Sequence, residues 1–369
     1  MKEKLFESLI SSIGNGMIKN IVSAEGTGAD TFLFNDFSNY LENKFPDSVI
    51  LNATKIDKKY LKETCLDLKS KKSHSFILIK NLWGYDDFDS IINICAGNTN
   101  IDIFAISSSK LPLLNKEKIT LVRGRVMTYD FPSTLYEDYI HTYKNKSIVD
   151  FLFNNDMNKE VISSNLQRLT RKEKACLDIC LDYNDTPLTF RSFAKKISER
   201  MGINFSRYHA QNIFAFFESL HILQVLDRYD LKKKKIIEGK IIYPIDTRFY
   251  ESASKNKNIK KYMTTAIIAK LFYDGFEVNK SCYSLQNKND FKANVDGGFL
   301  IKKDGISINI FIMPSIDEDN IDKIHRVPCS VQKVIITPDV ISDIHFSEDG
   351  LIYYSCETLL KEGLKIYAR

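Results

Sequence analysis

The sequence lacks the side-chain spacings that mark metal sites and disulfide frameworks. None of its six histidines stands at ligand spacing from another histidine or from a cysteine. Cys176 and Cys180 are four residues apart in a helical pattern, which favours two buried thiols over a metal site. The seven cysteines form no CxxC pair and lie at positions 65, 95, 176, 180, 282, 329 and 356. We therefore expect no metal ligand set, and an odd number of scattered cysteines is typical of a reducing compartment.

Long apolar runs and a strong excess of one charge sign are also missing. No run approaches the roughly 20 residues of a membrane span. The N-terminal MKEKLFESLISSIG lacks the apolar region and the cleavage site of a signal peptide. We expect a cytoplasmic protein without membrane contact. The formal charge of +5 permits nucleic-acid binding without requiring it.

A short glycine-rich loop is the first feature that suggests a ligand-binding site. In NIVSAEGTGADTFLF, residues 20–34, a strand-like run leads into a loop that contains Gly26 and Gly28, and a helix-like segment follows. This is the layout of a phosphate-binding loop, in which backbone N–H groups and a lysine hold a nucleotide. Here the lysine position is Ala29 and the hydroxyl position is Asp30.

The first region, residues 1–150, alternates apolar runs with segments of helix-like spacing. Such alternation predicts βαβ units and a parallel sheet covered by helices. The expected strands lie in the runs MIKNIVSA, SVILNA, SFILIK, IDIFAIS and KITLVRGRVMTYDF.

The second region, residues 160–250, has the pattern of a winged helix-turn-helix. Thr170 and Glu173 form a capping box before a first helix, and a second begins near Thr189 and ends near Gly202. Ser206 caps a third helix, and a hairpin with a lysine-rich turn follows. The third helix is then the recognition helix.

Polar side chains of this second region are the candidate nucleic-acid contacts. Arg207, Tyr208 and Gln211 on the third helix suit base edges in a major groove. The wing carries four candidate phosphate contacts, Lys232, Lys233, Lys234 and Lys235. A solvated lysine turn without a ligand remains the alternative.

The third region, residues 255–369, reads as a small α/β domain. It opens with a helix in IKKYMTTAIIAKLFYDG. A hairpin is expected to turn at residues 303–305, because Asp-Gly favours a tight turn. KVIITP is expected to add a further strand.

The order of these motifs resembles a prokaryotic family of AAA-type ATPases. In that family a P-loop domain precedes a winged helix and a C-terminal domain of restriction-endonuclease type. IDIFAISSSK corresponds to a TGSS strand, and LVRGRVMTYDFPSTLYEDYI to a Gly-Arg signature with the segment after it. KIIYPIDTRFY and NVDGGFLI correspond to the stretch after the wing and to an E-V-D-F strand. The resemblance implies these three domains, over nearly the whole chain.

The residues that would carry ATPase chemistry are replaced. A lysine that neutralises phosphates and a hydroxyl that holds Mg²⁺ are expected where Ala29 and Asp30 stand. The third expected strand should end in Asp-Glu and ends in Lys80-Asn81. Arg125 retains part of the Gly-Arg signature, for which a structural salt bridge is favoured. We interpret Asp30 as a helix N-cap in a loop that repels phosphate.

The nuclease-like domain has lost its acids in the same way. The resemblance implies an acid on a helix, an Asp on one strand and Glu/Gln-x-Lys on the next. Asp296 retains the strand Asp, while Thr264 and Asn309 stand where acids are expected. A single carboxylate seldom holds Mg²⁺ without others, and Asp296 before Gly297-Gly298 also suits a turn.

These losses lead to one favoured function and two alternatives. We expect a catalytically inactive AAA-type ATPase homologue, a pseudoenzyme without catalytic residues or cofactor, that binds nucleic acid or protein. DNA or RNA, an active ATPase paralogue and another protein all remain open as partners. One alternative is an active ATPase that uses ATP and Mg²⁺ through compensating residues. The other is an interaction subunit that binds no nucleic acid.

Overall fold

The structure of the chain is a computed structural model. It describes residues 2–23, 28–56, 60–71, 73–84, 88–95, 98–107, 124–131, 136, 139–140, 147–154, 166, 169–183, 185–250, 258–286, 292–338 and 344–365. The chain divides into two compact units. The first comprises Met1–Ser133, Glu160–Asn165 and Ser219–His221, and the second comprises Thr134–Lys159, Leu166–Glu218 and Ile222–Arg369.

A five-stranded parallel sheet forms the centre of the first unit. Its strands are β1 (Ile18–Val22), β2 (Val49–Asn52), β3 (Ser75–Lys80), β4 (Ile101–Ser107) and β5 (Val126–Asp130). Their order is β2-β3-β4-β1-β5, and every neighbouring pair is parallel. Each of the five apolar runs contains one strand. The predicted α/β class with a parallel sheet is therefore confirmed.

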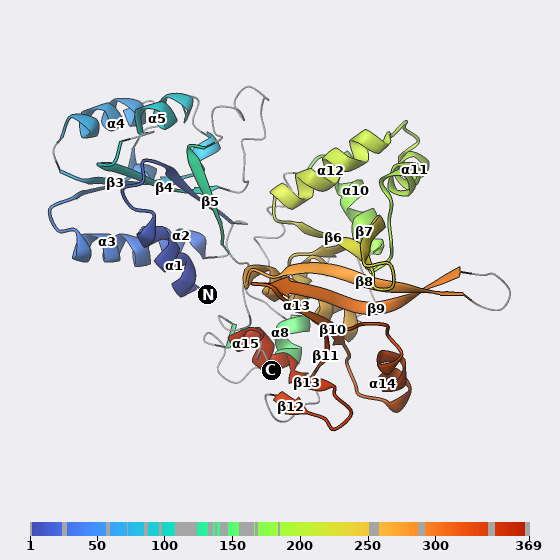
Figure 1. The fold of residues 1–369 in the computed structure, drawn as a ribbon. Helices are drawn as coiled ribbons and strands as arrows, with labels where there is room; N and C mark the ends of the chain where they lie inside the picture. Colours follow the sequence, from blue (N-terminus) through green and yellow to red (C-terminus); the bar gives the residue numbers. More distant parts are fainter. Residues whose placement is uncertain are drawn as a thin grey trace. The chain divides into compact units, whose positions relative to one another are not determined.

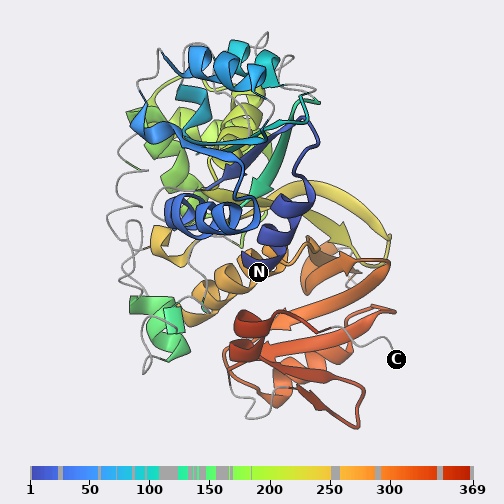
Figure 2. The ribbon, with the colours of Figure 1, turned by 90° about the vertical axis from the view of Figure 1, so that its left-hand side faces the viewer.

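Helices cover both faces of this sheet, as Figure 1 and the turned view in Figure 2 show. One face carries α4 (Leu61–Ser70) and α5 (Phe88–Cys95). The other face carries α1 (Lys2–Ser11), α2 (Ala29–Thr31), η1 (Phe32–Phe37) and α3 (Ser38–Lys44). Two short 3₁₀ turns, η2 (Ala53–Lys55) and η4 (Leu82–Gly84), follow β2 and β3.

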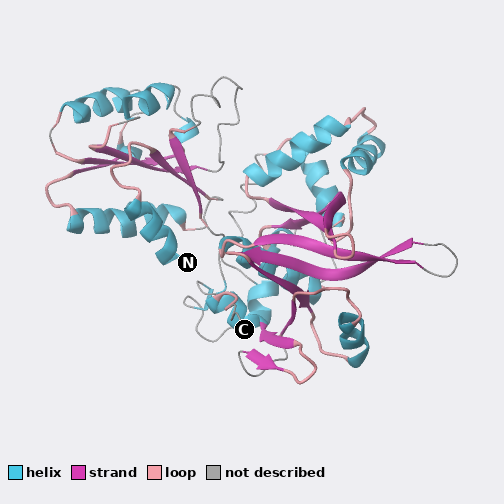
Figure 3. Ribbon diagram, in the orientation of Figure 1, coloured by secondary structure: helices cyan, strands magenta, loops and turns pink. Residues whose placement is uncertain are grey.

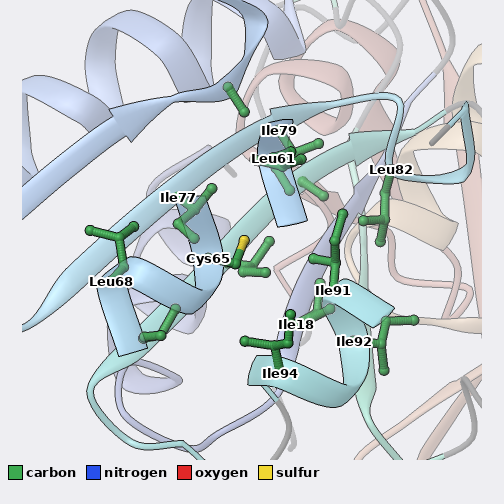
Figure 4. Packing of buried hydrophobic residues seen from close by; sticks show 14 residues of the cluster. Ile18, Leu61, Cys65, Leu68, Ile77, Ile79, Leu82, Ile91, Ile92 and Ile94 are labelled. Carbon is green, nitrogen blue, oxygen red and sulfur yellow. The ribbon is translucent and has the colours of Figure 1, made fainter. Parts of the chain in front are cut away.

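The inner strand β3 is apolar on both sides because it is buried on both sides. Ile77 and Ile79 pack into the cluster under α4 and α5, which Figure 4 shows. Phe76 and Leu78 alternate with them and pack on the opposite face. All four are fully buried, and burial of one such side chain stabilises the fold by about 1.5–3 kcal/mol.

Helices precede most strands of the second unit, and the sequence predicted the starts of three of them and the end of one. α8 (Ile148–Asn154) precedes α10 (Arg171–Asp182), α11 (Phe190–Met201) and α12 (Arg207–Ser219). The capping box of Thr170 and Glu173 is confirmed, and Thr189 caps α11 with Ser192. Gly202 ends α11 in the left-handed conformation, at φ +64°.

An eight-stranded sheet forms the rest of the second unit. Its strands are β6 (Leu223–Asp230), β7 (Lys235–Pro244), β8 (Glu277–Gln286), β9 (Lys292–Lys303), β10 (Ile306–Ile312), β11 (Gln332–Thr337), β12 (Ile344–Phe346) and β13 (Ile352–Ser355). Their order is β12-β13-β11-β10-β9-β8-β6-β7. The other elements are η5 (Thr247–Tyr250), α13 (Ile259–Tyr273), α14 (Glu318–His325) and α15 (Cys356–Glu362).

The hairpin that follows α12 belongs to this large sheet. β6 pairs with β7 in antiparallel fashion and with β8 in parallel, over residues 228–230 and 280–282. Figure 3 shows β8 and β9 as a long pair beside this hairpin. The expected wing and the strands of the expected C-terminal domain therefore share one sheet. The division at residues 1–150, 160–250 and 255–369 stays a prediction.

Candidate functional site

The carboxyl edge of the parallel sheet positions most of the residues that the sequence analysis assigned to a nucleotide site. Ligands of open parallel sheets bind outside the carboxyl ends of the strands. Gly26 lies outside the described residues. Gly28 has φ +89° and precedes the first turn of α2, where glycine is strongly favoured. Ala29 is 4% exposed and packs with Phe32 in the core, so this position offers no side chain to a ligand.

Asp30 is paired with Lys80 at this edge. The Lys80 ammonium, at the end of β3, lies 2.5 Å from the Asp30 carboxylate, and both side chains are about half exposed. The interpretation of Asp30 as an N-cap is wrong. Gly28 is the N-cap residue, and Asp30 lies in the first turn, where its carboxylate meets Lys80. The charges of Asp30 and Lys80 thus neutralise each other.

Two further candidate residues, Asn81 and Arg125, make contacts within the first unit. Asn81 has φ +56°, and its N–H donates to the carbonyl of Ile106 at 2.6 Å. This bond ties the end of β3 to the end of β4. The Arg125 guanidinium donates to the side-chain oxygen of Asn93. Its observed partner is therefore an amide on α5, whereas a salt bridge was expected.

A buried charged group at the opposite edge of this sheet was not predicted from the sequence. Lys19 on β1 and Asp102 on β4 are both fully buried and form an ion pair. Asp102 also accepts from the backbone N–H of Gly14 at 2.9 Å and lies 2.8 Å from the His74 ring. Burial lowers the pKa of Lys19 despite Asp102. The sequence signal that could have predicted this pair is one charged residue inside each of two apolar runs, Lys19 in MIKNIVSA and Asp102 in IDIFAIS.

The exposed face of α12 carries the predicted base-contacting side chains. Arg207, Tyr208 and Gln211 are all exposed, and the Tyr208 residue is 64% accessible. The Ser206 hydroxyl accepts the N–H of His209 at 3.2 Å, so the predicted cap holds the first turn of α12.

A basic hollow lies between the first turns of α11 and α12. Its volume is about 540 Å³, and its lining is Thr189, Arg191, Ser192, Ala194, Lys195, Phe205 and Arg207. The lining contains three cationic side chains and no acidic one. Lys195 pairs with Glu199 at 3.7 Å. Within the described part of the chain, neither Arg191 nor Arg207 forms an ion pair, whereas Arg200 meets two carboxylates. Arg191 and Lys195 were not predicted from the sequence.

The four wing lysines fall into two pairs. Lys232 donates to the carbonyl of Ser284 at 2.8 Å, and Lys233 lies 3.6 Å from the Asp230 carboxylate. The backbone N–H groups of Lys232 and Lys233 also donate to Asp230. Lys234 and Lys235 are exposed and, among the described residues, lie near no carboxylate. Lys234 and Lys235 are therefore more available for phosphate contacts than Lys232 and Lys233.

Asp296 lies inside β9, so the expectation that it shapes a turn is wrong, and its carboxylate is paired. Its carboxylate accepts the N–H of Gly298 at 2.9 Å and lies 3.2 Å from the Lys280 ammonium. Asn309 is fully buried and donates to the carbonyl of Gly297 at 2.7 Å. Thr264, at the expected place of the helix acid, is buried in α13.

The described residues also bear on metal binding and on membrane insertion. In the ranges that the structure describes, no three His, Cys, Asp or Glu side chains are grouped so that they could hold a metal ion. None of the described helices combines the length and the apolar character that crossing a membrane requires.

Comparisons with known proteins gave structural similarities only. No family model matches the chain, and no curated protein matches it. A Walker-type ATPase of Pyrococcus abyssi is 10% identical with a TM-score of 0.42, covering 68% of this chain and 95% of that one. The Orc1 protein of Aeropyrum pernix in complex with DNA is 10% identical with a TM-score of 0.31, covering 68% and 91%.

A third similar structure is Drosophila ORC bound to AT-rich DNA and Cdc6. It is 12% identical with a TM-score of 0.28, covering 68% of this chain and 90% of that one. Because all three TM-scores are below 0.5, these similarities do not assign the chain to a family.

Proposed function

We propose that the chain is a non-catalytic homologue of AAA-type ATPases that binds nucleic acid through α11 and α12. In this proposal α10, α11, α12, β6 and β7 form a winged helix-turn-helix. An isolated antiparallel bridge joins Leu188, before α11, to Lys240 on β7 of its hairpin. The helix α13 with the later strands is a restriction-endonuclease-like domain that does not cut.

The basic hollow is the observation that carries this proposal. Arg191 and Arg207 are long cations without carboxylate partners in the described residues, at the first turns of neighbouring helices. Backbone N–H groups at helix starts and arginine side chains both bind phosphate. Tyr208 and Gln211 follow on the exposed side of α12, where base edges can be reached. Phosphates in the hollow would position the helix, and these two side chains would read bases.

The Asp30–Lys80 pair supports the absence of nucleotide turnover. A nucleotide with Mg²⁺ brings a strongly negative phosphate chain that needs a lysine and metal ligands. Ala29 supplies no charge, and the one cation at the end of β3 is already neutralised by Asp30. The carboxylate of Asp30 would also repel phosphate. We therefore infer that the Asp30–Lys80 pair disfavours nucleotide binding at the carboxyl edge of the parallel sheet.

Duplex binding at several salt concentrations tests the nucleic-acid role. Wild-type protein is titrated into labelled duplex DNA and duplex RNA, and fluorescence anisotropy reports the affinity. Arg191→Ala and Arg207→Ala should each weaken binding and reduce the slope of log K against log salt by about one. The matched control is Lys69→Ala on α4, which removes one exposed charge from the first unit and should leave binding unchanged.

Each other outcome favours a different function. If wild-type protein binds neither duplex, or if Lys69→Ala acts like Arg207→Ala, the proposed interface is wrong and an interaction subunit becomes the better account. Calorimetric titration with ATP and Mg²⁺, and with ADP, tests nucleotide binding at the carboxyl edge of the parallel sheet. We expect no binding at millimolar nucleotide, and micromolar binding would favour the active ATPase.

A further inference from the structure

A lysine ammonium lies between two carboxylates in the second unit, at a place separate from the basic hollow. The Lys280 cluster comprises Asp185, Tyr243, Lys280 and Asp296. The Lys280 ammonium on β8 lies 3.1 Å from Asp185, which follows α10, and 3.2 Å from Asp296 on β9. Asp185 is distant in the sequence from the other two, which lie on the neighbouring strands β8 and β9. One cation therefore joins the segment after α10 to two strands.

The Lys280 side chain is nearly buried, whereas its two carboxylate partners are about half exposed. The Lys280 side chain is 11% exposed, and its ammonium lies 4.3 Å from the centre of the Phe299 ring. The fully buried Tyr243 hydroxyl donates to Asp185 at 2.6 Å. The Asp296 carboxylate is oriented by the N–H of Gly298. Both carboxylates are thus held in place by donors other than Lys280.

The same arrangement of oxygens suits a metal ion. Two carboxylates that converge on one point, with a hydroxyl beside them, are the type of ligand that divalent cations prefer. An ammonium supplies one positive charge at that point through three hydrogen-bond donors. Without it, two negative groups would lie within reach of each other and repel.

The geometry points to a cation site in which the chain supplies its own cation. The Lys280 ammonium holds the position of a divalent ion, and this internal cation fastens the segment after α10 to β8 and β9. Replacing Lys280 with an uncharged side chain converts the site into one that binds a divalent ion from solution. The inference is independent of nucleic-acid binding.

Thermal unfolding with and without Mn²⁺ tests this inference on the full chain. Lys280→Met keeps most of the side-chain length and removes the charge. In EDTA, its unfolding midpoint should fall by about 3 °C, because two carboxylates that are about half exposed lose the cation between them. Millimolar MnCl₂ should restore part of this loss. Wild-type protein and the double variant Lys280→Met/Asp296→Asn are the matched controls, and neither should respond to MnCl₂.

Two results would overturn the inference. One is a Lys280→Met midpoint in EDTA equal to that of wild type, and the other is an equal Mn²⁺ response in all three proteins. If Lys280→Met does not fold, variants of the two carboxylates test whether the ammonium bridges them. Asp185→Asn and Asp296→Asn each leave the ammonium one carboxylate partner. The double variant Asp185→Asn/Asp296→Asn should therefore lose more free energy of unfolding than the sum of the two single variants. Additive losses would show that the ammonium does not bridge them.

Discussion

Lysine side chains meet carboxylates at both places where the sequence suggested metal-dependent chemistry. Lys80 and Asp30 are about half exposed, and such a pair contributes only about 0–1 kcal/mol to stability. The Lys280 side chain is 11% exposed and has two carboxylate partners. The burial of a charge makes its partners matter more, because losing one leaves the charge uncompensated. Replacing Lys280 should therefore lower the stability of the protein more than replacing Lys80.

The pH dependence of stability should reveal Lys280. Burial lowers the pKa of its ammonium, but the carboxylates of Asp296 and Asp185 outweigh burial, and the pKa is raised. A raised pKa means that the folded protein holds the proton more tightly. The resulting stabilisation is complete below the ordinary lysine pKa of 10.5 and is lost as pH rises through the raised value.

The measurement is urea unfolding of wild type and Lys280→Met at a series of pH values. The difference in free energy of unfolding should be constant from about pH 7 to pH 9 and should shrink only above the ordinary lysine pKa. Using the difference cancels the titration of the other lysines. A difference that disappears already near neutral pH would contradict the raised pKa.

At the scale of elements, the register of the eight-stranded sheet depends on a close approach at β9. Gly298 has φ +83°, and a Cβ there would collide with the carbonyl of Ile310 and lie 2.9 Å from the Phe311 ring. β9 and β10 are neighbours in this sheet, with Ile310 opposite Phe299. Glycine is therefore needed for its conformation and for its lack of a side chain.

Gly298→Ala should destabilise the protein by about 3 kcal/mol or more, because backbone strain and a steric clash add. Gly350→Ala is the matched control. Gly350 has a similar φ of +85° in the turn before β13, and a Cβ at this position would meet no atom of the described residues within 4 Å. The control should lose about 1 kcal/mol. Urea unfolding measures both, and equal losses would show that the β9–β10 approach does not matter.

At the scale of the whole molecule, each compact unit has its own buried core. Ile77 lies in the core of the first unit, and Ile310 lies in the eight-stranded sheet of the second. Both side chains are fully buried. Chains with separate cores commonly unfold in more than one step.

Calorimetry of two core variants tests the division. Ile77→Ala and Ile310→Ala should each lose about 2–5 kcal/mol, because each leaves a cavity. We expect two thermal transitions, of which each variant lowers the one that belongs to its own unit. A single transition that both variants lower equally would contradict separate unfolding units.

Local features of the chain were determined by the sequence. The apolar runs of β1 to β5, the capping box of Thr170 and Glu173, the glycine end of α11 and the Asp304-Gly305 turn are all where they were predicted. Periodicity, caps and turns depend on neighbours within a few residues, so the sequence contains this information. The sequence also identified Asp30, Lys80, Arg207 and Asp296 as candidate site residues.

The partners of these residues were decided by the tertiary structure alone. Lys80 meets Asp30 across 50 residues, and Lys280 on β8 meets Asp185, which follows α10. The pairing of β6 with β8, which joins the hairpin to the later strands, was not foreseen either. Sheet register and the packing of distant segments settle such contacts. No local pattern in the sequence records them, because each depends on where the whole chain folds back.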